Sequence, residues 1–319
     1  MHISSVWPWL EPGDGFSHAT SNDEKLPRIS IVTPNCNYGH LIEMTMRSVI
    51  LQSYANLEYI VIDDGSTDNS VEVINKYISQ LAYFEQHPNQ GQYATINKGF
   101  SKATGEIVAW LNSDDIYLPW TLRTVAAIFS QFPDVDWIIG CSSGIQDGVV
   151  QSVSALQPFP RPLIRAGLFH TGPGGCGRAI QQESTFWRRS LWERAGGLRT
   201  DLLYAADFEL WTRFAEYADL HAVSTLLGGF TIRKNENRSI VNRDLYMNEV
   251  ELVIRHLTRN VGSAEARLAR RVRLNQKVSR YRFCYKMANT LFPLTDLRGP
   301  ILAWNFSDSC YKRVHRSPY

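Results

Sequence analysis

Short apolar runs alternate with amphipathic segments along the first half of the chain. The apolar runs are short and rich in β-branched residues, which predicts buried strands at 28–34, 57–62, 107–111 and 135–139. The segments between them place apolar residues at helical spacing, which predicts helices at 41–52, 71–78, 93–102 and 119–132. Strands and helices that alternate in this way are typical of βαβ units, so the pattern predicts an α/β domain with a mostly parallel central sheet flanked by helices.

The pattern changes after residue 140. A Gly- and Pro-rich stretch interrupts it, and further on the apolar spacing predicts a strand at 182–186 and helices at 190–195 and 207–217. From residue 245 the spacing predicts helices rich in Lys and Arg. We therefore predict three parts, which are an irregular N-terminal extension (1–26), an α/β domain (27–244) and a basic helical C-terminal extension (245–319).

Composition supports a globular protein with a substantial core, since 44% of the 319 residues are hydrophobic and 20% are charged. The net charge of +2 is unevenly spread, because residues 251–319 hold fourteen Lys and Arg against four Asp and Glu. One interpretation is a solvated helix face; the other is a basic amphipathic surface that meets an anionic membrane. No nucleic-acid-binding module is recognised, so we expect no nucleic-acid partner.

The spacing of the cysteines and the hydropathy of the chain predict the cellular compartment of the protein. The five cysteines are scattered and lack metal-ligand spacing, which favours reduced thiols in the cytoplasm. No apolar run is long enough for a transmembrane helix, and the N-terminus lacks the pattern of a signal peptide. We expect a cytoplasmic protein with peripheral contact at the inner face of the membrane through residues 251–319.

Pairs of carboxylates follow two of the predicted strands, Asp63-Asp64 and Asp114-Asp115, and Asp207 begins a later helix. The carboxyl ends of neighbouring parallel strands meet in one crevice, so we expect the first two pairs to lie close together. Adjacent carboxylates repel each other, and a divalent cation bound with a diphosphate would relieve that repulsion. The alternative is that these residues only form turns and cap helices.

Five segments of the chain resemble family-two glycosyltransferases. They are 29–38 (ISIVTPNCNY), 62–68 (IDDGSTD), 89–91 with 97–99, 105–106 leading into 111–115, and 206–211 (ADFELW). The resemblance covers about residues 28–233. It implies a GT-A fold and the inverting transfer of a sugar from a nucleotide-diphosphate donor, with a UDP-sugar favoured. The acceptor would be a hydroxyl of a glycan or lipid-linked molecule, in surface polysaccharide biosynthesis.

The resemblance also implies which residues bind the donor. They line the nucleotide pocket, contact the base and ribose, or border the ribose or diphosphate, and they are Thr33, Pro34, Asn37, Asp63, Asp64, Gly91 and Asn97. The Asp-x-Asp metal motif of the family is here Asn112-Ser113-Asp114. We therefore expect Asp114 to be the main ligand of Mn²⁺ or Mg²⁺, with Asn112, Ser113 and Asp115 around the donor.

The remaining expected roles belong to the reaction and the acceptor. Inverting transfer needs a base for the acceptor hydroxyl, and by the resemblance this base is Asp207. Ala206 stands where the family has a further acid. Glu183, Trp187 and Arg233 are candidates for binding the acceptor or the diphosphate, although Glu183 can equally be a structural acid and Arg233 part of a basic surface.

Two other functions remain to be compared with a transferase. A catalytically weak sugar-nucleotide-binding or scaffold protein of a glycan assembly complex is supported by Asn112 and Ala206, which replace acids of the family pattern. A Rossmann-type dehydrogenase is excluded, because no Gly-x-Gly-x-x-Gly follows the first strand.

Overall fold

The computed structural model describes residues 8, 26–146, 149–233, 236–260, 263–279 and 298–316. Almost all of the predicted N-terminal extension, 1–26, lies outside the described residues, and so do residues 280–297 and 317–319 of the predicted C-terminal extension. The three-part division of the chain therefore stays a prediction.

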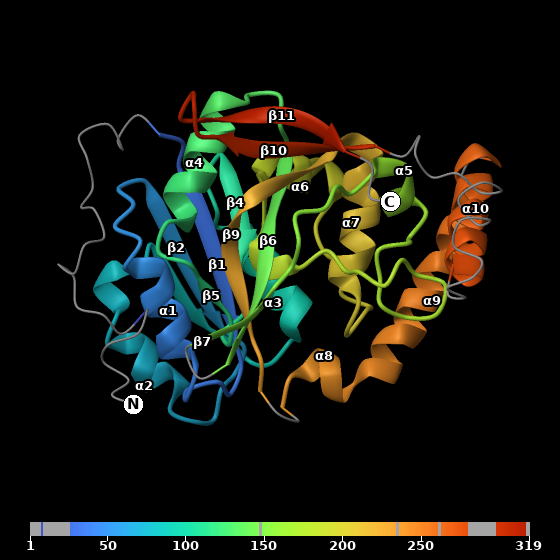
Figure 1. Ribbon diagram of the computed structural model, residues 1–319. Helices are drawn as coiled ribbons and strands as arrows, with labels where there is room; N and C mark the ends of the chain where they lie inside the picture. The colour runs from blue at the N-terminus through green and yellow to red at the C-terminus, as the bar shows by residue number, and fades with distance from the viewer. Residues whose placement is uncertain are drawn as a thin grey trace.

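The elements follow the predicted alternation through the first half of the chain (Figure 1). The strands are β1 (Ile29–Asn35), β2 (Leu57–Asp63), β3 (Tyr83–Gln86), β4 (Ile107–Trp110), β5 (Ile116–Tyr117), β6 (Trp137–Gln146), β7 (Val149–Val153), β8 (Thr185–Arg188), β9 (Leu220–Thr231), β10 (Gly299–Asn305) and β11 (Cys310–Arg316). The α-helices are α1 (Ile42–Ile50), α2 (Ser70–Asn75), α3 (Gln92–Phe100), α4 (Thr121–Gln131), α5 (Arg161–Arg165), α6 (Arg189–Ala195), α7 (Ala206–Tyr217), α8 (Arg238–Val241), α9 (Arg243–Asn260) and α10 (Ser263–Ser279). Two short 3₁₀ helices are η3 (Ile78–Gln80) and η4 (Gln182–Ser184).

Within the described residues, eleven strands form one sheet with the main order β11-β10-β9-β6-β8-β4-β1-β2-β3. Strand β1 pairs in parallel with β2 and β4, and β2 pairs in parallel with β3. Strand β8 is antiparallel to both of its neighbours, β4 and β6. The predicted α/β class with a mostly parallel central sheet is therefore confirmed.

The central strands are buried because helices cover both faces of the sheet. All seven residues of β1 and all four of β4 are buried, which explains why these segments are nearly continuous apolar runs. The carboxyl ends of β1, β2 and β4 consequently open at the same edge of the sheet, as the topology of parallel strands requires.

An aromatic core joins β4 to α7. The rings of Trp110 and Trp211 are stacked with their centroids 5.8 Å apart, and Trp187 meets Trp110 edge-on at 5.4 Å. Trp137 and Phe214 extend the cluster. Because interlocked rings allow little relative motion, this core holds the end of β4 and the start of α7 in a fixed relation.

The C-terminal part is not wholly helical, in contrast to the expectation. Helices α9 and α10 lie beside α7 and α5, while β10 and β11 return to the sheet (Figure 1). Strand β10 pairs in parallel with β9, with Ile301 opposite Ala222, and β11 closes the hairpin. No helix in the described parts of the chain is both long and apolar enough to cross a membrane.

Candidate active site

A cleft of about 990 Å³ opens at the carboxyl ends of β1, β2 and β4. Its walls also include the loop before α3, the η4 turn, the start of α7 and the segment from α8 to α9. Of the predicted site residues, those that line it are Pro34, Asp64, Gly91, Asn112, Ser113, Asp114, Asp115, Glu183 and Asp207. The structure thus gathers five acids from four separate segments around one cleft.

Asp64 lies directly after β2 and holds the loop before α3. Its Oδ1 accepts a hydrogen bond from the backbone N–H of Gln90 at 2.7 Å, and its Oδ2 accepts one from Gly91 at 3.0 Å. The Nδ1 atom of His87 lies 3.4 Å from Oδ1. Gly91 has a φ of +92°, a conformation that favours glycine. Asp64 therefore shapes the 89–91 loop as well as lining the cleft.

Two other predicted donor-binding residues shape the same region without lining the cleft. Asp63 is fully buried and accepts hydrogen bonds from the backbone N–H and the hydroxyl of Ser66, at 2.9 and 2.6 Å. The Oδ1 atom of Asn37 accepts a bond from the backbone N–H of Thr67 at 2.8 Å. These contacts fix the turn after β2.

Thr33 and Trp187 lie in the core rather than on the cleft wall. The Thr33 hydroxyl is buried and bonded to the Tyr59 hydroxyl at 3.0 Å. Trp187 is fully buried among the rings around Trp110. This places Trp187 away from the acceptor position that its neighbourhood in the sequence suggested.

Asn112 is the centre of a side-chain network at the end of β4. Its Oδ1 accepts a hydrogen bond from Gln92 at 3.0 Å, and its Nδ2 donates to Gln182 at 3.2 Å. Gln182 in turn donates a short hydrogen bond to the backbone carbonyl of Trp110. Asn112 therefore links α3, β4 and η4, and its amide supplies both a donor and an acceptor where an aspartate could only accept.

Asp114 forms an ion pair with Arg233, which follows β9. Burial raises the pKa of Asp114, and the positive charge of Arg233 opposes that shift. The Arg233 guanidinium also lies 5.1 Å from the centroid of the Tyr38 ring and 3.4 Å from a carboxylate oxygen of Glu236. Arg233 is not among the residues that line the cleft, but it holds the side chain of a residue that does.

Asp115 and Glu183 are buried acids at the floor of the cleft. Asp115 Oδ1 accepts a bond from the backbone N–H of Thr231 at 3.0 Å, whereas Glu183 Oε1 is buried with no hydrogen-bond partner among the described residues. Burial raises the pKa of both, that of Glu183 to about 7, and neighbouring carboxylates add to each shift. An unpartnered buried carboxyl oxygen is costly, so Glu183 is suited to receive a polar group of a ligand.

The backbone of η4 is held against β9 by close contact. A Cβ atom at Gly228 would lie 2.0 Å from the carbonyl oxygen of Glu183, so no larger residue fits there. The hydroxyl of Thr185 donates to the carbonyl of Gln181 at 2.8 Å and closes the turn. The Glu183 side chain is thus presented by a rigid segment.

Asp207 is the second residue of α7 and lines the cleft together with Asp64. Its Oδ1 accepts a hydrogen bond from the backbone N–H of Phe208 at 2.7 Å. Burial raises the pKa of Asp207 to about 6, and the charge of Glu249 adds to the shift. A carboxylate with a pKa near 6 is ionised at neutral pH yet more basic than usual, which suits a general base.

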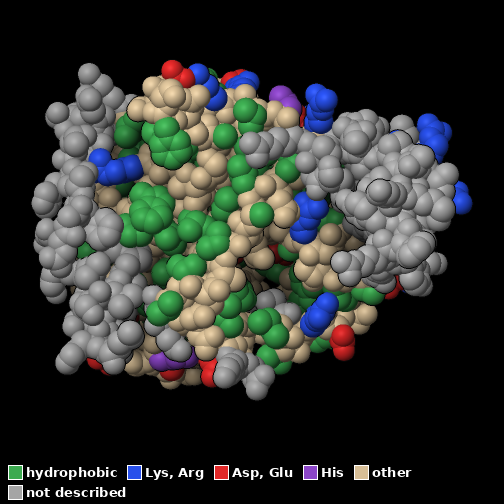
Figure 2. All heavy atoms as spheres, viewed as in Figure 1, with side chains coloured by type: hydrophobic (Ala, Val, Ile, Leu, Met, Phe, Trp, Pro, Cys, Tyr) green, Lys and Arg blue, Asp and Glu red, His purple; other side chains and the backbone are tan. Residues whose placement is uncertain are grey.

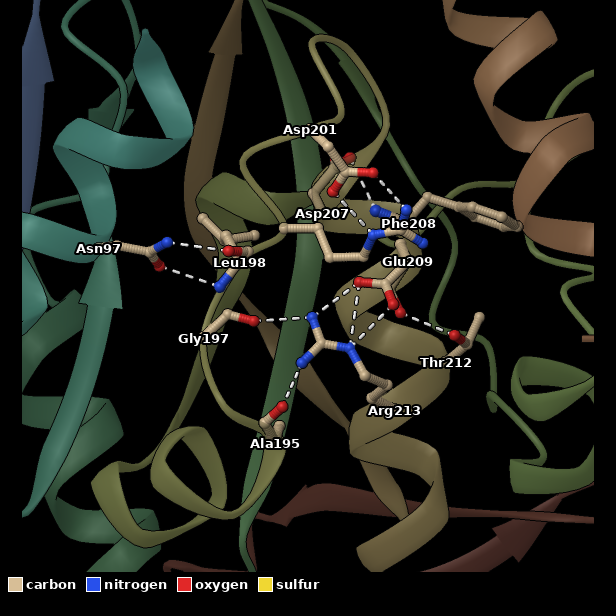
Figure 3. A network of polar contacts seen from close by, with 11 residues as sticks. Asn97, Ala195, Gly197, Leu198, Asp201, Asp207, Phe208, Glu209, Thr212 and Arg213 are labelled. Carbon is tan, nitrogen blue, oxygen red and sulfur yellow. Dashed lines mark hydrogen bonds and ion pairs between the residues drawn. The ribbon is translucent and has the colours of Figure 1, made fainter. Parts of the chain in front are cut away.

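Arg213 ties α7 to the loop after α6 (Figure 3). Its guanidinium donates to the backbone carbonyls of Ala195 and Gly197, the latter at 2.7 Å, and pairs with Glu209 at 2.7 Å. The side chains of Arg213 and Glu209 are 23% and 10% exposed, so the pair is largely removed from solvent. This clamp fixes the helix that carries Asp207.

Asn97 reinforces the same loop instead of facing the cleft. Its amide nitrogen donates to the carbonyl of Leu198 at 2.8 Å, and its Oδ1 accepts from the N–H of Leu198 at 2.9 Å (Figure 3). This pair of hydrogen bonds joins the side chain of Asn97 to the backbone of Leu198. Asn97 therefore connects α3 to the segment that precedes α7.

We expect Arg213→Ala to lower the free energy of unfolding by about 3 kcal/mol, because it leaves Glu209 and two carbonyls without their partner in a mostly buried setting. Chemical denaturation would measure the loss. Arg199→Ala is the matched control, since its ion pair with Asp201 is exposed and worth under about 1 kcal/mol. Equal losses in the two variants would contradict the importance of the clamp.

The oxygen atoms of the cleft residues show whether this site could bind the expected divalent metal ion. Among the described residues no group of three His, Cys, Asp or Glu is arranged to hold a metal ion by itself. Asp114 lines the cleft beside Ser113, with Arg233 on one of its oxygens. Oxygen ligands suit Mg²⁺ and Mn²⁺, so these residues fit a cation that takes one carboxylate from Asp114 and most of its ligands from a diphosphate.

Sequence reasoning missed several residues of the site. Gln92 and Gln182 hold Asn112, Tyr246 lines the cleft from α9, and Glu249 lies behind the start of α7. The glutamines stand beside motifs that the sequence did reveal, so their positions were a usable signal. Nothing in the local sequence around Tyr246 or Glu249 connects them to the cleft.

Comparison with known proteins gives matches over much of the chain. Residues 30–194 match the model of a family described as glycosyl transferase family 2. An uncharacterized glycosyltransferase of Nostoc sp. is 32% identical over 167 residues, which are 49% of this chain and 51% of that protein. The uncharacterized glycosyltransferase YibD of Escherichia coli is 35% identical over 179 residues, 55% of this chain and 49% of that protein. The chain spans about half to three fifths of the length of the first curated relatives that it matches.

The solved structures include one with the same fold at low sequence identity. The structure of S. aureus TarS 1–349 in complex with UDP-GlcNAc superposes with a TM-score of 0.61 and 20% identity, and covers 83% of this chain and 75% of that one. The structure of the same protein in complex with UDP gives a TM-score of 0.59. The likeness extends beyond residue 194 and includes a large part of the second half of the chain.

Proposed function

Because this chain belongs to glycosyl transferase family 2 and has the GT-A fold, we propose that it transfers a sugar from a nucleotide-diphosphate donor, with inversion, to an acceptor hydroxyl. A UDP-sugar is the favoured donor, which is in keeping with the UDP-GlcNAc bound to TarS. The proposed acceptor is a glycan or a lipid-linked saccharide, in the assembly of a surface polysaccharide.

One observation carries this proposal. Asp64 after β2, Asp114 after β4 and Asp207 at the start of α7 line a single cleft. We assign the first to the nucleoside, the second to a cation that binds the diphosphate, and the third to the proton of the acceptor. A site that only bound the nucleotide would not need a buried carboxylate with a raised pKa at the start of α7 as well.

The proposed reaction is a single displacement. Asp207 accepts the proton of the acceptor hydroxyl while the hydroxyl oxygen attacks the anomeric carbon of the donor. The bond between that carbon and the diphosphate oxygen breaks, and the nucleoside diphosphate leaves with the bonding electrons. Attack from the face opposite the leaving group inverts the anomeric configuration.

The leaving diphosphate needs compensation for its developing negative charge. A bound Mn²⁺ or Mg²⁺ would supply Lewis-acid stabilisation of that charge, with Asp114 as its protein ligand. Arg233 is held next to Asp114 and is the cation of this chain that we assign to the diphosphate. Ser113 lies beside them on the cleft wall and offers a hydroxyl.

Glu183 is proposed to bind a hydroxyl of the acceptor or of the donor sugar. The residue lines the cleft together with Asp207, its buried Oε1 has no hydrogen-bond partner among the described residues, and the charge of Asp207 contributes to its raised pKa. With a pKa near 7, the side chain exists in both protonation states at neutral pH and can donate or accept a hydrogen bond.

Binding and turnover of nucleotide sugars test the proposed function. We expect UDP-sugars with Mn²⁺ to stabilise the chain by about 2.7 kcal/mol at a ligand concentration 100 times Kd. A thermal-shift panel of UDP-, GDP- and other nucleotide sugars would measure this, and release of UDP on adding candidate acceptors would measure turnover. Stabilisation without any release of UDP would favour the scaffold function, and no stabilisation by any nucleotide sugar would contradict both.

Contact of residues 251–319 with an anionic membrane stays a proposal. In α10 the side chains of Arg267 and Arg270 are exposed, which is what such a surface needs. On the face drawn in Figure 2, however, the described Lys and Arg side chains are dispersed and form no continuous patch. Much of the predicted basic segment, 280–297, lies outside the described residues.

A further inference from the structure

The carboxylate of Glu249, in the second turn of α9, lies at the N-terminal end of α7. It accepts hydrogen bonds from three consecutive backbone N–H groups, those of Leu203 and Tyr204 at 2.8 Å and that of Ala205 at 2.9 Å. A side chain that binds three successive amides of one loop fixes the path of that loop. The loop leads directly into Asp207.

The first residues of α7 do not bind these three N–H groups with their own side chains. The N-cap, Ala205, makes no side-chain hydrogen bond, Ala206 has no polar side-chain atom, and Asp207 accepts from the N–H of Phe208 instead. Of the three groups that Glu249 binds, the N–H of Ala205 belongs to the N-cap and the other two precede the helix. The carboxylate also brings a negative charge to the helix end where the dipole favours it, close to Ala206, which stands where the family has a further acid.

The helix that carries Glu249 is anchored on both sides of this residue. Val250 and Val253 are buried in the main core, with exposures of 0% and 4%. Tyr246, one turn earlier, lines the cleft. Glu249 is therefore held between the core and the cleft wall, in a position that allows little movement.

We propose that Glu249 is a positioning residue for the transfer reaction, which holds the loop before α7 so that Asp207 faces the acceptor hydroxyl. The inference rests on the proposed role of Asp207 as the base. It assigns to the C-terminal segment a direct part in arranging the reacting groups, in addition to forming the wall of the cleft.

The negative charge of Glu249 predicts the direction in which the pKa of Asp207 should change when this residue is replaced. Its negative charge raises the pKa of Asp207, in addition to the larger effect of burial. The other titratable and charged side chains that line the cleft with Asp207 include Asp114, Glu183, Tyr204, Arg243 and Tyr246. The variants below leave all of them in place, so any shift in the Asp207 titration is due to residue 249.

The test compares Glu249→Gln with Glu251→Gln. The second residue is on the same helix, but it is exposed and pairs with Arg255.

For Glu249→Gln we expect kcat to fall about 10- to 100-fold, because the base is no longer held in the productive geometry. We expect the acid limb of the kcat/KM profile, near pH 6 in the wild type, to move to lower pH, because the pKa of Asp207 falls when the nearby charge is removed. UDP affinity should not change, and Glu251→Gln should match the wild type throughout.

Glu249→Asp separates charge from geometry and serves also if the glutamine variant fails to fold. It keeps the charge but is one methylene shorter, so kcat should fall while the acid limb stays near its wild-type pH. An unchanged kcat and pH profile in Glu249→Gln would overturn the inference, and so would a fall in kcat with no shift of the acid limb.

Failure of this inference can be told apart from failure of the proposed function. If Asp207→Asn is inactive and Glu249→Gln behaves as Glu251→Gln does, only the inference about Glu249 fails. If Asp207→Asn keeps full activity, the proposed base is wrong and the role of Glu249 falls with it.

Discussion

Asp207→Asn is expected to lower the rate of sugar transfer about 10²- to 10⁴-fold and to leave UDP affinity unchanged. Asparagine has nearly the same shape as aspartate but cannot accept the proton of the acceptor hydroxyl. The region around Asp64 and Gly91, which we propose binds the nucleotide, is built from other segments and keeps its contacts. Steady-state UDP release with an acceptor would measure transfer, and calorimetric titration with UDP would measure binding.

The matched control for this change is Asp201→Asn. Asp201 precedes α7 on the same loop, but its side chain is exposed and pairs with Arg199. It should keep wild-type transfer and binding. Full activity in Asp207→Asn would show that another group removes the proton, and Glu183 would then be the first residue to examine.

Asp114→Asn is expected to remove the gain in UDP affinity that Mn²⁺ provides and to lower transfer about 100-fold or more. The substitution takes away the carboxylate that we assign to the cation and also the ion pair with Arg233. UDP titrations with and without Mn²⁺ would separate the two effects, because loss of the ion pair alone would not depend on the metal.

Asp134→Asn is the control for Asp114→Asn. Its carboxylate is exposed and pairs with Arg313 outside the cleft. A response to Mn²⁺ in Asp114→Asn that equals the response of the wild type would contradict the assignment of Asp114 as the metal ligand.

The sequence was sufficient to predict the parts of the site that follow from topology. Asp64 and Asp114 follow β2 and β4, and parallel pairing through β1 brings those strand ends to one edge of the sheet. Strand and helix periodicity is enough to predict that arrangement. The same holds for the α/β class.

Where a strand is buried on both faces, the sequence does not predict in which direction each side chain points. Every residue of β1 is apolar or buried, so the pattern does not tell whether Thr33 points to the cleft or to Tyr59. The aromatic ring of Trp187 could in principle stack on a sugar. Because β8 pairs between β4 and β6, however, this side chain points into the core. Only tertiary structure decides such cases.

Contacts between distant segments account for the other omissions. Glu249 contacts the loop before α7 only because α9 folds back along α7, and no local pattern encodes that return. The β10–β11 hairpin was missed for the same reason, since β10 depends on the exposed edge of β9 for its pairing.

The place of β10 in the sheet has a consequence for biosynthesis. Strand β9 pairs along its length with β6 on one side, and on the other side Ala222 and Val223 pair, within the described part of the chain, with residues 301 and 302 of β10. While the ribosome makes the intervening segment, this part of β9 presents unpaired N–H and C=O groups to other nascent chains, a known route to aggregation. The polypeptide is therefore most in need of chaperone protection after its catalytic segments have been made and before its last strands emerge.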